Sequence, residues 1–297
     1  MKYLKITLAL AFSVLILTSC GGNKKKAAAA DEDFTMEDFV EAAEAIDPNL
    51  NRVDQLFKIL DMVNAEYYDA LCSDPYNAHS YKFEYPVAAA NLGIYMTDII
   101  YHLYGENNEA MYLSFAAAQE LAKYVGVESE FGSWTIESLE GQAISRDTMA
   151  NLFNQLLDDS EKYNTEQEVV FIHTAFLTGS FVEKVYITSN LLKQKLSAKE
   201  LTKEEEGDIR ELLVIYMNQL DPSASVLYQA YEQQQTELEG LVVLTTFEKL
   251  KELSAHLKSV KSALVAAPVS QIASNEDLEK SFNLIANLRM VLVTAED

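Results

Sequence analysis

Residues 86–104 read PVAAANLGIYMTDIIYHLY, with Gly105 directly after them, and this stretch predicts a long helix. A proline suits the first turn of a helix, because its missing N–H is not needed there, and a glycine suits the end. Between them the residues are nearly all apolar, apart from one stripe of polar side chains at helical spacing. The stretch therefore predicts a helix whose polar stripe needs an explanation.

Similar helical signals recur from Phe34 to the end of the chain, and no segment predicts a persuasive strand. Among 297 residues, Gly (10) and Pro (5) are scarce, which argues against an all-β fold with many tight turns. We therefore expect an all-α fold, a large antiparallel multi-helix bundle of about nine or ten helices with no sheet. Because no Gly-, Ser- or Pro-rich linker divides residues 34–297, we expect a single α-helical domain there.

Capping residues and helix breakers predict where the helices begin and end. The expected helices cover about 34–46, 53–67, 86–104 and 108–124, and 73–85 is the longest expected loop. Thr135 and Ser145 are the expected N-caps of two further helices, and a capping box at Thr165 and Glu168 begins a helix to about Leu192. A second box at Thr202 and Glu205 begins a helix that is expected to end at Asp221-Pro222. One long or two collinear helices are expected over 223–267, with a break at Gly240, and a last helix from Ser274 to about Thr294.

The first residues predict an export signal. Lys2 and Lys5 precede an uncharged run over 6–17, which is too short to span a bilayer. The run ends in Leu17-Thr18-Ser19-Cys20, which resembles the bacterial lipobox, and an ordinary secretory signal is the alternative. The resemblance implies a lipoprotein signal peptide over 1–19, a lipid on Cys20 and a flexible tether over 20–33. Gly21 follows the cysteine, and by resemblance to the enterobacterial sorting rule this favours the outer membrane, on its periplasmic face or at the cell surface.

Charge excludes one class of partner. The chain has 23 basic and 46 acidic residues, and a formal net charge of −23. Because nucleic acid binding needs a basic face, we expect no nucleic acid partner.

Two cysteines exclude a disulfide scaffold and a Cys-rich metal site, and Cys72 is expected to be a buried, inert thiol or else to form an intermolecular disulfide.

Two helices carry polar stripes. In 86–104, the stripe is Asn91, Tyr95, Asp98 and His102, which lie within about 60° of one another on a helix. Its preferred interpretation is a solvated face, and Asp98 and His102 lie one turn apart, close enough to pair. In the helix ending near Leu192, the stripe is Gly179, Glu183, Tyr186 and Asn190. There the solvent side is expected around His173, Lys184 and Thr188, so Glu183 lies on or near an apolar face, where a carboxylate needs a partner or a raised pKa.

The segments Asn91-Leu92-Gly93-Ile94-Tyr95-Met96-Thr97-Asp98 and Gly179-Ser180-Phe181-Val182-Glu183-Lys184-Val185-Tyr186 resemble an uncharacterised family of helical lipoproteins from Bacteroidota. The resemblance covers about residues 50–195. It implies a helical fold and an envelope location, and it implies no reaction.

No catalytic or metal-binding motif is present: the four histidines form no His-Glu-x-x-His pair, and the Gly-x-Ser-x-Gly elbow and the phosphate loop are missing. We therefore expect no cofactor, no metal and no assigned catalytic residue.

The leading hypothesis is a membrane-anchored binding or interaction module for a protein, peptide or envelope polymer. The alternative is a small-ligand receptor with a pocket between helices 86–104 and 166–192. Its candidate binding residues are Asn91, Tyr95, Asp98, His102, Glu183 and Tyr186. An enzyme that uses Asp98 with His102, or Glu183, as acid or base is the third hypothesis.

Overall fold

The computed structural model describes residues 56, 60, 61, 64–127, 145, 148, 151, 170–197, 201–233 and 241–294, all within one compact unit, Thr35–Asp297. Every element in these ranges is helical and none is a strand, which confirms the all-α bundle. The predicted signal peptide, Cys20 and the tether lie outside the described residues. So do the expected helix over 34–46, most of the one over 53–67, Thr135, the box at Thr165 and Glu168, and Gly240. The single domain over 34–297 stays a prediction.

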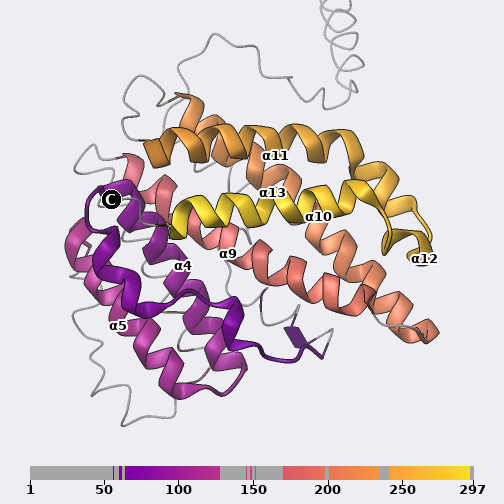
Figure 1. Ribbon diagram of the computed structural model, residues 1–297, viewed down its shortest axis with the longest axis horizontal. Helices are drawn as coiled ribbons and strands as arrows, with labels where there is room; N and C mark the ends of the chain where they lie inside the picture. Colours follow the sequence, from indigo (N-terminus) through magenta and orange to yellow (C-terminus); the bar gives the residue numbers. More distant parts are fainter. Residues whose placement is uncertain are drawn as a thin grey trace, which may run out of the picture. The chain divides into compact units, whose positions relative to one another are not determined.

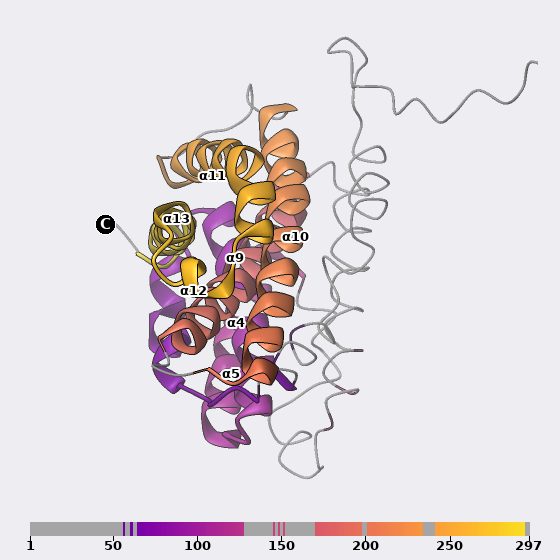
Figure 2. The same ribbon diagram turned by 90° about the vertical axis from the view of Figure 1, so that its right-hand side faces the viewer.

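Figure 1 shows the described helices, and Figure 2 shows them from the side. In chain order they are η1 (Asp69–Leu71), η2 (Pro75–Tyr81), α4 (Tyr85–Tyr104), α5 (Asn108–Val125), α9 (Val170–Leu196), α10 (Lys203–Gln233), α11 (Leu241–Ala266), α12 (Val269–Ile272) and α13 (Glu276–Val293). Helix α4 packs on α5 on one side and on α9 on another, and α9 also packs on α10 and α13. Helix α9 thus joins the α4–α5 pair to the C-terminal helices.

Most helix ends follow the capping signals. Gly105 ends α4, and Gly126 ends α5 with a φ of 90°, a left-handed conformation that favours glycine. The capping box before α10 is complete, because the Thr202 N–H donates to the Glu205 carboxylate and the Glu205 N–H donates to the Thr202 hydroxyl. Ser145 accepts a hydrogen bond from the Thr148 N–H, as an N-cap does.

Several boundaries differ from the prediction. Residues 65–67 are not helical although the expected helix over 53–67 includes them, and residues 223–233 belong to α10 instead of the helix expected over 223–267. The loop over 73–85 contains the 3-10 helix η2, which Asp74 caps by accepting from the Tyr76 N–H. Helix α10 continues through Pro222 to Gln233, where the sequence predicted an end. A proline inside a helix costs about 3 kcal/mol, and here buried residues on both sides, such as Leu220 and Leu227, hold one continuous helix against the core. The N-cap of α13 is Asn275 instead of Ser274.

Helix α4 is buried on every side. All residues from Val87 to His102 are buried, because α5, α9, η2 and α13 each cover part of its surface. A helix that is apolar nearly all round is typical of such a position. The few polar side chains on α4 are therefore buried as well and need partners inside the protein.

Two glycines allow α4 and α9 to approach closely. A Cβ atom at Gly179 would overlap the backbone carbonyl of Ala90, and one at Gly93 would overlap the backbone of Phe176 and Ser180. One turn further along, the hydroxyls of Thr97 and Ser180 lie 3.2 Å apart and form a hydrogen bond between the helices. The glycines of the two quoted motifs are therefore packing residues that set the distance between the helices.

We predict that Gly179→Ala and Gly93→Ala each lower the free energy of unfolding by at least about 2 kcal/mol, because a backbone cannot yield to the added methyl as a side chain can. Gly207 in α10 is the matched control, since no atom lies within 4 Å of its Cβ position. Gly207→Ala should be neutral or stabilise by up to about 1 kcal/mol. Urea unfolding of the three variants measures this, and equal effects at all three glycines would contradict the packing role.

Candidate functional site

The two polar stripes meet inside the protein. The side chains of Asn91, Tyr95 and Asp98 are fully buried, and those of His102 and Glu183 nearly or fully so. The predicted solvated face on α4 is therefore wrong, because neighbouring elements cover this helix all round. The predicted solvent side of α9 is wrong for the same reason, since His173, Lys184 and Thr188 are buried too. Tyr186 is half-buried.

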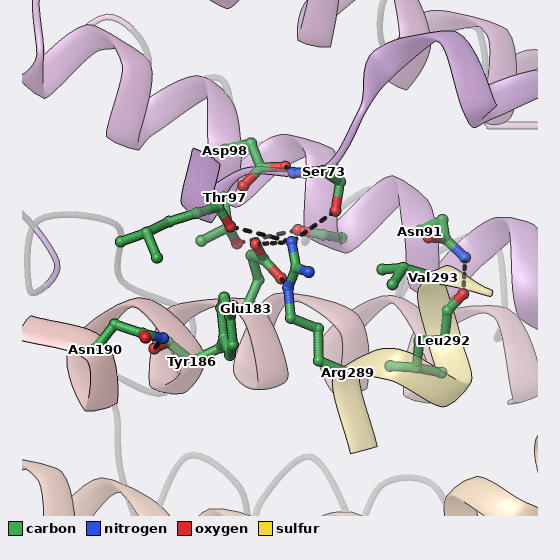
Figure 3. A network of polar contacts seen from close by, with 12 residues as sticks. Ser73, Asn91, Thr97, Asp98, Glu183, Tyr186, Asn190, Arg289, Leu292 and Val293 are labelled. Atoms are coloured by element: carbon green, nitrogen blue, oxygen red, sulfur yellow. Dashed lines mark hydrogen bonds and ion pairs between the residues drawn. The ribbon is translucent and has the colours of Figure 1, made fainter. Parts of the chain in front are cut away.

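Arg289 of α13 binds the carboxylate of Glu183 with two hydrogen bonds. Its Nε donates to Glu183 Oε2 at 2.6 Å, and one terminal nitrogen donates to Oε1 at 2.8 Å (Figure 3). The Glu183 side chain has no exposed surface, and that of Arg289 is 14% exposed. The guanidinium also lies 4.4 Å from the centre of the Tyr186 ring, a cation–π contact. A planar fork on a carboxylate is the strongest form of ion pair that side chains make.

The same guanidinium holds a neighbouring segment, residues 67–74, which we name the strap. An Arg289 terminal nitrogen donates to the Leu71 carbonyl at 3.1 Å and to the Ser73 hydroxyl at 2.9 Å. The Ser73 backbone N–H in turn donates to Asp98 Oδ2 at 3.0 Å. Figure 3 shows that Asp98 and Glu183 face the guanidinium from two different helices. The cluster therefore ties α4, α9, α13 and the strap together.

The charges of this cluster balance only when it holds a proton. It contains two carboxyl groups and one guanidinium, and no described residue forms a hydrogen bond to the buried Asp98 Oδ1. Burial and the charge of Glu183 raise the pKa of Asp98 well above its usual range, although Arg289 and the Ser73 N–H act in the opposite sense. Burial alone would lower the pKa of Arg289, but Glu183 raises it, so the guanidinium stays charged. A neutral Asp98 beside a Glu183–Arg289 ion pair satisfies this charge balance.

His102 belongs to a second group of contacts at the other end of the strap. Its Nδ1 lies 2.7 Å from the Tyr67 hydroxyl, and its Nε2 lies 3.2 Å from the Ser114 hydroxyl. The Tyr67 hydroxyl also donates to Asp69 at 2.7 Å. Burial lowers the pKa of His102 to about 4, so the ring is neutral at pH 7. The predicted option of an Asp98–His102 pair is not realised, because the two side chains bind different partners.

Cys72 lies between the two groups. Its sulfur is 3.8 Å from His102 Nδ1, and the thiol is half-buried and free. Burial raises its pKa, and the acidic side chains of Asp98 and Glu183 beside it act in the same direction. A nucleophilic cysteine needs the opposite, a pKa lowered by a cationic neighbour. The surroundings of Cys72 therefore favour the protonated thiol.

Asn91 and Tyr95 do not join the acid cluster. Asn91 Nδ2 donates to the Leu292 carbonyl at 2.7 Å, and the Tyr81 hydroxyl donates to the Val293 carbonyl at 2.9 Å, so α4 and η2 bind the end of α13. The Tyr95 hydroxyl donates to the Asp74 carbonyl at 2.8 Å. Both side chains bind backbone carbonyls of neighbouring segments, and the Asp74 carbonyl also accepts from the Asn77 N–H.

Sequence reasoning found Asp98 and Glu183 but missed Arg289 and Ser73. A signal for Arg289 exists, because it stands in the apolar run Leu288-Arg289-Met290-Val291-Leu292, as Glu183 stands in the apolar part of α9. Two opposite charges on two apolar helices are candidates for an ion pair. Ser73 binds Asp98 through its backbone N–H, a group that nearly every residue type carries, so its identity gives no signal of this contact.

No protein-family model, curated protein or solved structure matches this chain at a significant level. Within the described ranges, no three His, Cys, Asp or Glu side chains are arranged to hold a metal ion. Likewise, no described helix is both long enough and apolar enough to cross a bilayer.

We predict that Arg289→Gln lowers the free energy of unfolding by about 3–5 kcal/mol, because it leaves Glu183 buried beside Asp98 without a counter-charge. Asp98→Asn should change it by less than about 1 kcal/mol, since an amide can still accept from Ser73 and donate to Glu183. Met290→Ala is the control, as this neighbour is 56% exposed and should shift stability by about 0.5 kcal/mol at most.

Denaturant unfolding at pH 7 separates these variants. A loss at Asp98→Asn as large as the loss at Arg289→Gln would contradict a neutral Asp98, because it would mean that the carboxylate charge itself stabilises the fold.

Proposed function

We propose that this protein is a lipid-anchored component of the bacterial cell envelope whose helical body binds a partner protein, peptide or envelope polymer. The lipobox-like Leu17-Thr18-Ser19-Cys20 supports the anchor, and the resemblance to helical lipoproteins of Bacteroidota is consistent with it. Gly21 supports the outer membrane. An anchor of two or more acyl chains holds a protein stably on a bilayer.

The observation that carries the binding role is an uneven distribution of exposed apolar side chains. Seven large hydrophobic side chains are exposed in the described part of the chain, and four of them lie between residues 68 and 85. These four are Tyr68, Tyr76, Phe83 and Tyr85. Tyrosine at a surface offers apolar area with a hydrogen-bonding tip and is enriched at interfaces. This part of the surface therefore suits a binding role.

Three aromatic rings of this region form a group that we name the aromatic face: Phe83, Tyr85 and Tyr124. Glu84 between the first two has an extended backbone, with φ −136° and ψ 135°, so Phe83 and Tyr85 point to the same side. The ring of Tyr85 stacks on that of Tyr124 of α5, with 5.0 Å between centroids and 25° between planes. An ion pair between Lys82 and Glu120 adds a second link between the same two segments. These two contacts hold the segment that carries Phe83 and Tyr85 against α5.

The geometry favours a surface over the alternative pocket between the two striped helices. At Gly93 and Gly179 the backbones of α4 and α9 are in contact, and further along Asp98 faces Glu183, whose carboxylate binds the Arg289 guanidinium. The acidic groups of the stripes are used by partners within the chain. An enzymatic role receives no support from Cys72 or His102, because the pKa of the thiol is raised and that of the imidazole is lowered.

Metabolic labelling with a fatty-acid probe tests the anchor. We expect the parent chain to be labelled and Cys20→Ser to be unlabelled and released from the membrane fraction, because only the thiol can carry the diacylglycerol. Equal labelling of both would exclude the lipid on Cys20.

The binding role is tested with the full-length lipoprotein, purified in detergent. The measurement is its saturable binding to solubilised cell envelope of the bacterium from which it comes. The double variant Phe83→Ser with Tyr85→Ser should lose at least tenfold in affinity, because buried aromatic anchors dominate binding energies. Leu244→Ser is the matched control, since Leu244 of α11 is 42% exposed and Phe83 is 44% exposed. Binding that is equally strong in both variants would place the interface elsewhere, and no saturable binding by the parent would remove the proposal.

A further inference from the structure

We propose that the strap, residues 67–74, is a proton-linked latch: opening of the strap releases one proton from the buried Asp98–Glu183 pair, so the strap opens more readily as the pH rises. This goes beyond the proposed binding role, because it concerns a conformational change inside the body and needs neither the anchor nor a partner.

The strap is held by side chains of the surrounding helices. The Tyr68 N–H donates to the Tyr101 hydroxyl at 3.1 Å, and the Ser73 N–H donates to the Asp98 carboxyl group. The Leu71 carbonyl accepts from the Arg289 guanidinium. The Gln194 amide of α9 donates to the Tyr68 hydroxyl at 2.6 Å. Each of these bonds uses one helix side chain, so the strap can leave without disturbing the backbone hydrogen bonds of α4, α9 or α13. Segments with few backbone bonds of their own open at lower free energy than helices.

The groups that face Asp98 come from each element packed around it. They are Glu183 on α9, Arg289 on α13, Cys72 in the strap and Tyr95 on α4. Cys72 in turn lies against His102, which pairs with Asp69. Among these groups, Arg289 is the one fixed cation, and its guanidinium already donates two hydrogen bonds to the Glu183 carboxylate. Within the described residues, Asp98 Oδ1 is fully buried and accepts no hydrogen bond, and the Asp98 side chain lies within hydrogen-bond reach of the Glu183 carboxylate. With the strap closed, an ionised Asp98 would give the cluster a net negative charge without water to solvate it.

Opening removes this constraint. Without the strap, water reaches Asp98, and its pKa returns toward the ordinary value of about 4. Between that value and the raised pKa of the closed form, the open form therefore holds one proton fewer. By linkage, the equilibrium constant for opening then rises tenfold for each pH unit in this window and is constant above it. His102 acts in the opposite sense between about pH 4 and 6.5, because opening exposes its ring and lets it take up a proton.

Thiol labelling of Cys72 reports the opening, because Cys72 lies within the strap and its half-buried thiol becomes fully accessible when the strap opens. We would label the full-length chain with dithiodipyridine from pH 5 to pH 9 and follow the Cys72 peptide by mass spectrometry. The same measurement is made on Asp98→Asn, which keeps the hydrogen bonds of the closed strap but cannot release the proton. The ratio of the two rates cancels the intrinsic reactivity of the thiol and the contribution of His102.

We expect this ratio to rise tenfold per pH unit and then to level off at the pKa of Asp98 in the closed form. Glu183→Gln is a second variant that should also remove the rise, because Asp98 can then ionise against Arg289 without excess charge. A ratio that does not change with pH overturns the proposal. Amide exchange in α10 is measured in the same samples, and a parallel increase there also overturns it, since the proton would then be linked to unfolding of the whole body.

Discussion

The ion pair between Arg289 and Glu183 is the interaction on which the arrangement around α4 and α9 depends. The carboxylate lies fully buried on α9, and the guanidinium from α13 supplies a fixed counter-charge while also binding the strap. Burying such a pair is expensive, and replacing it by apolar side chains is often no less stable. Its value here is specificity, because one guanidinium satisfies acceptors from two separate parts of the chain. Sequence positions 71, 73, 183 and 289 thereby become neighbours.

The sequence is sufficient for the helical fold and for most helix ends, because capping residues act locally. Gly105, Gly126 and the Thr202–Glu205 box each satisfy backbone groups within one turn, and each marks its boundary correctly. Helix α10 shows where local reasoning fails, since apolar packing on both sides of Pro222 outweighs the break that the proline predicts. The surroundings of α4 were unpredictable in the same way: a polar stripe on one helix looks the same whether water or another helix faces it.

The candidate site was half predictable for the same physical reason. A carboxylate on an apolar helix face needs a partner, which correctly singles out Glu183, but the partner is 106 residues away in the chain. The part that the strap plays in this cluster could not be predicted from the sequence, because the strap contributes backbone groups and a hydroxyl instead of a recognisable motif. The proposed aromatic face consists of other side chains, the exposed Phe83 and Tyr85 and the half-buried Tyr124 of α5. The buried polar groups thus organise the body, and the exposed aromatic groups are free to meet a partner.

The contact at Gly93 and Gly179 also limits how this sequence can diverge. A hydrogen atom is all that fits between each glycine and the opposite backbone, so neither position tolerates change by itself. A lineage that gains a methyl group on one helix must shift the other, and this shift would pull Asp98 and Glu183 out of register with Arg289. Both glycines and the Glu183–Arg289 pair should therefore be retained together, which gives a marker for recognising distant relatives whose surface residues differ.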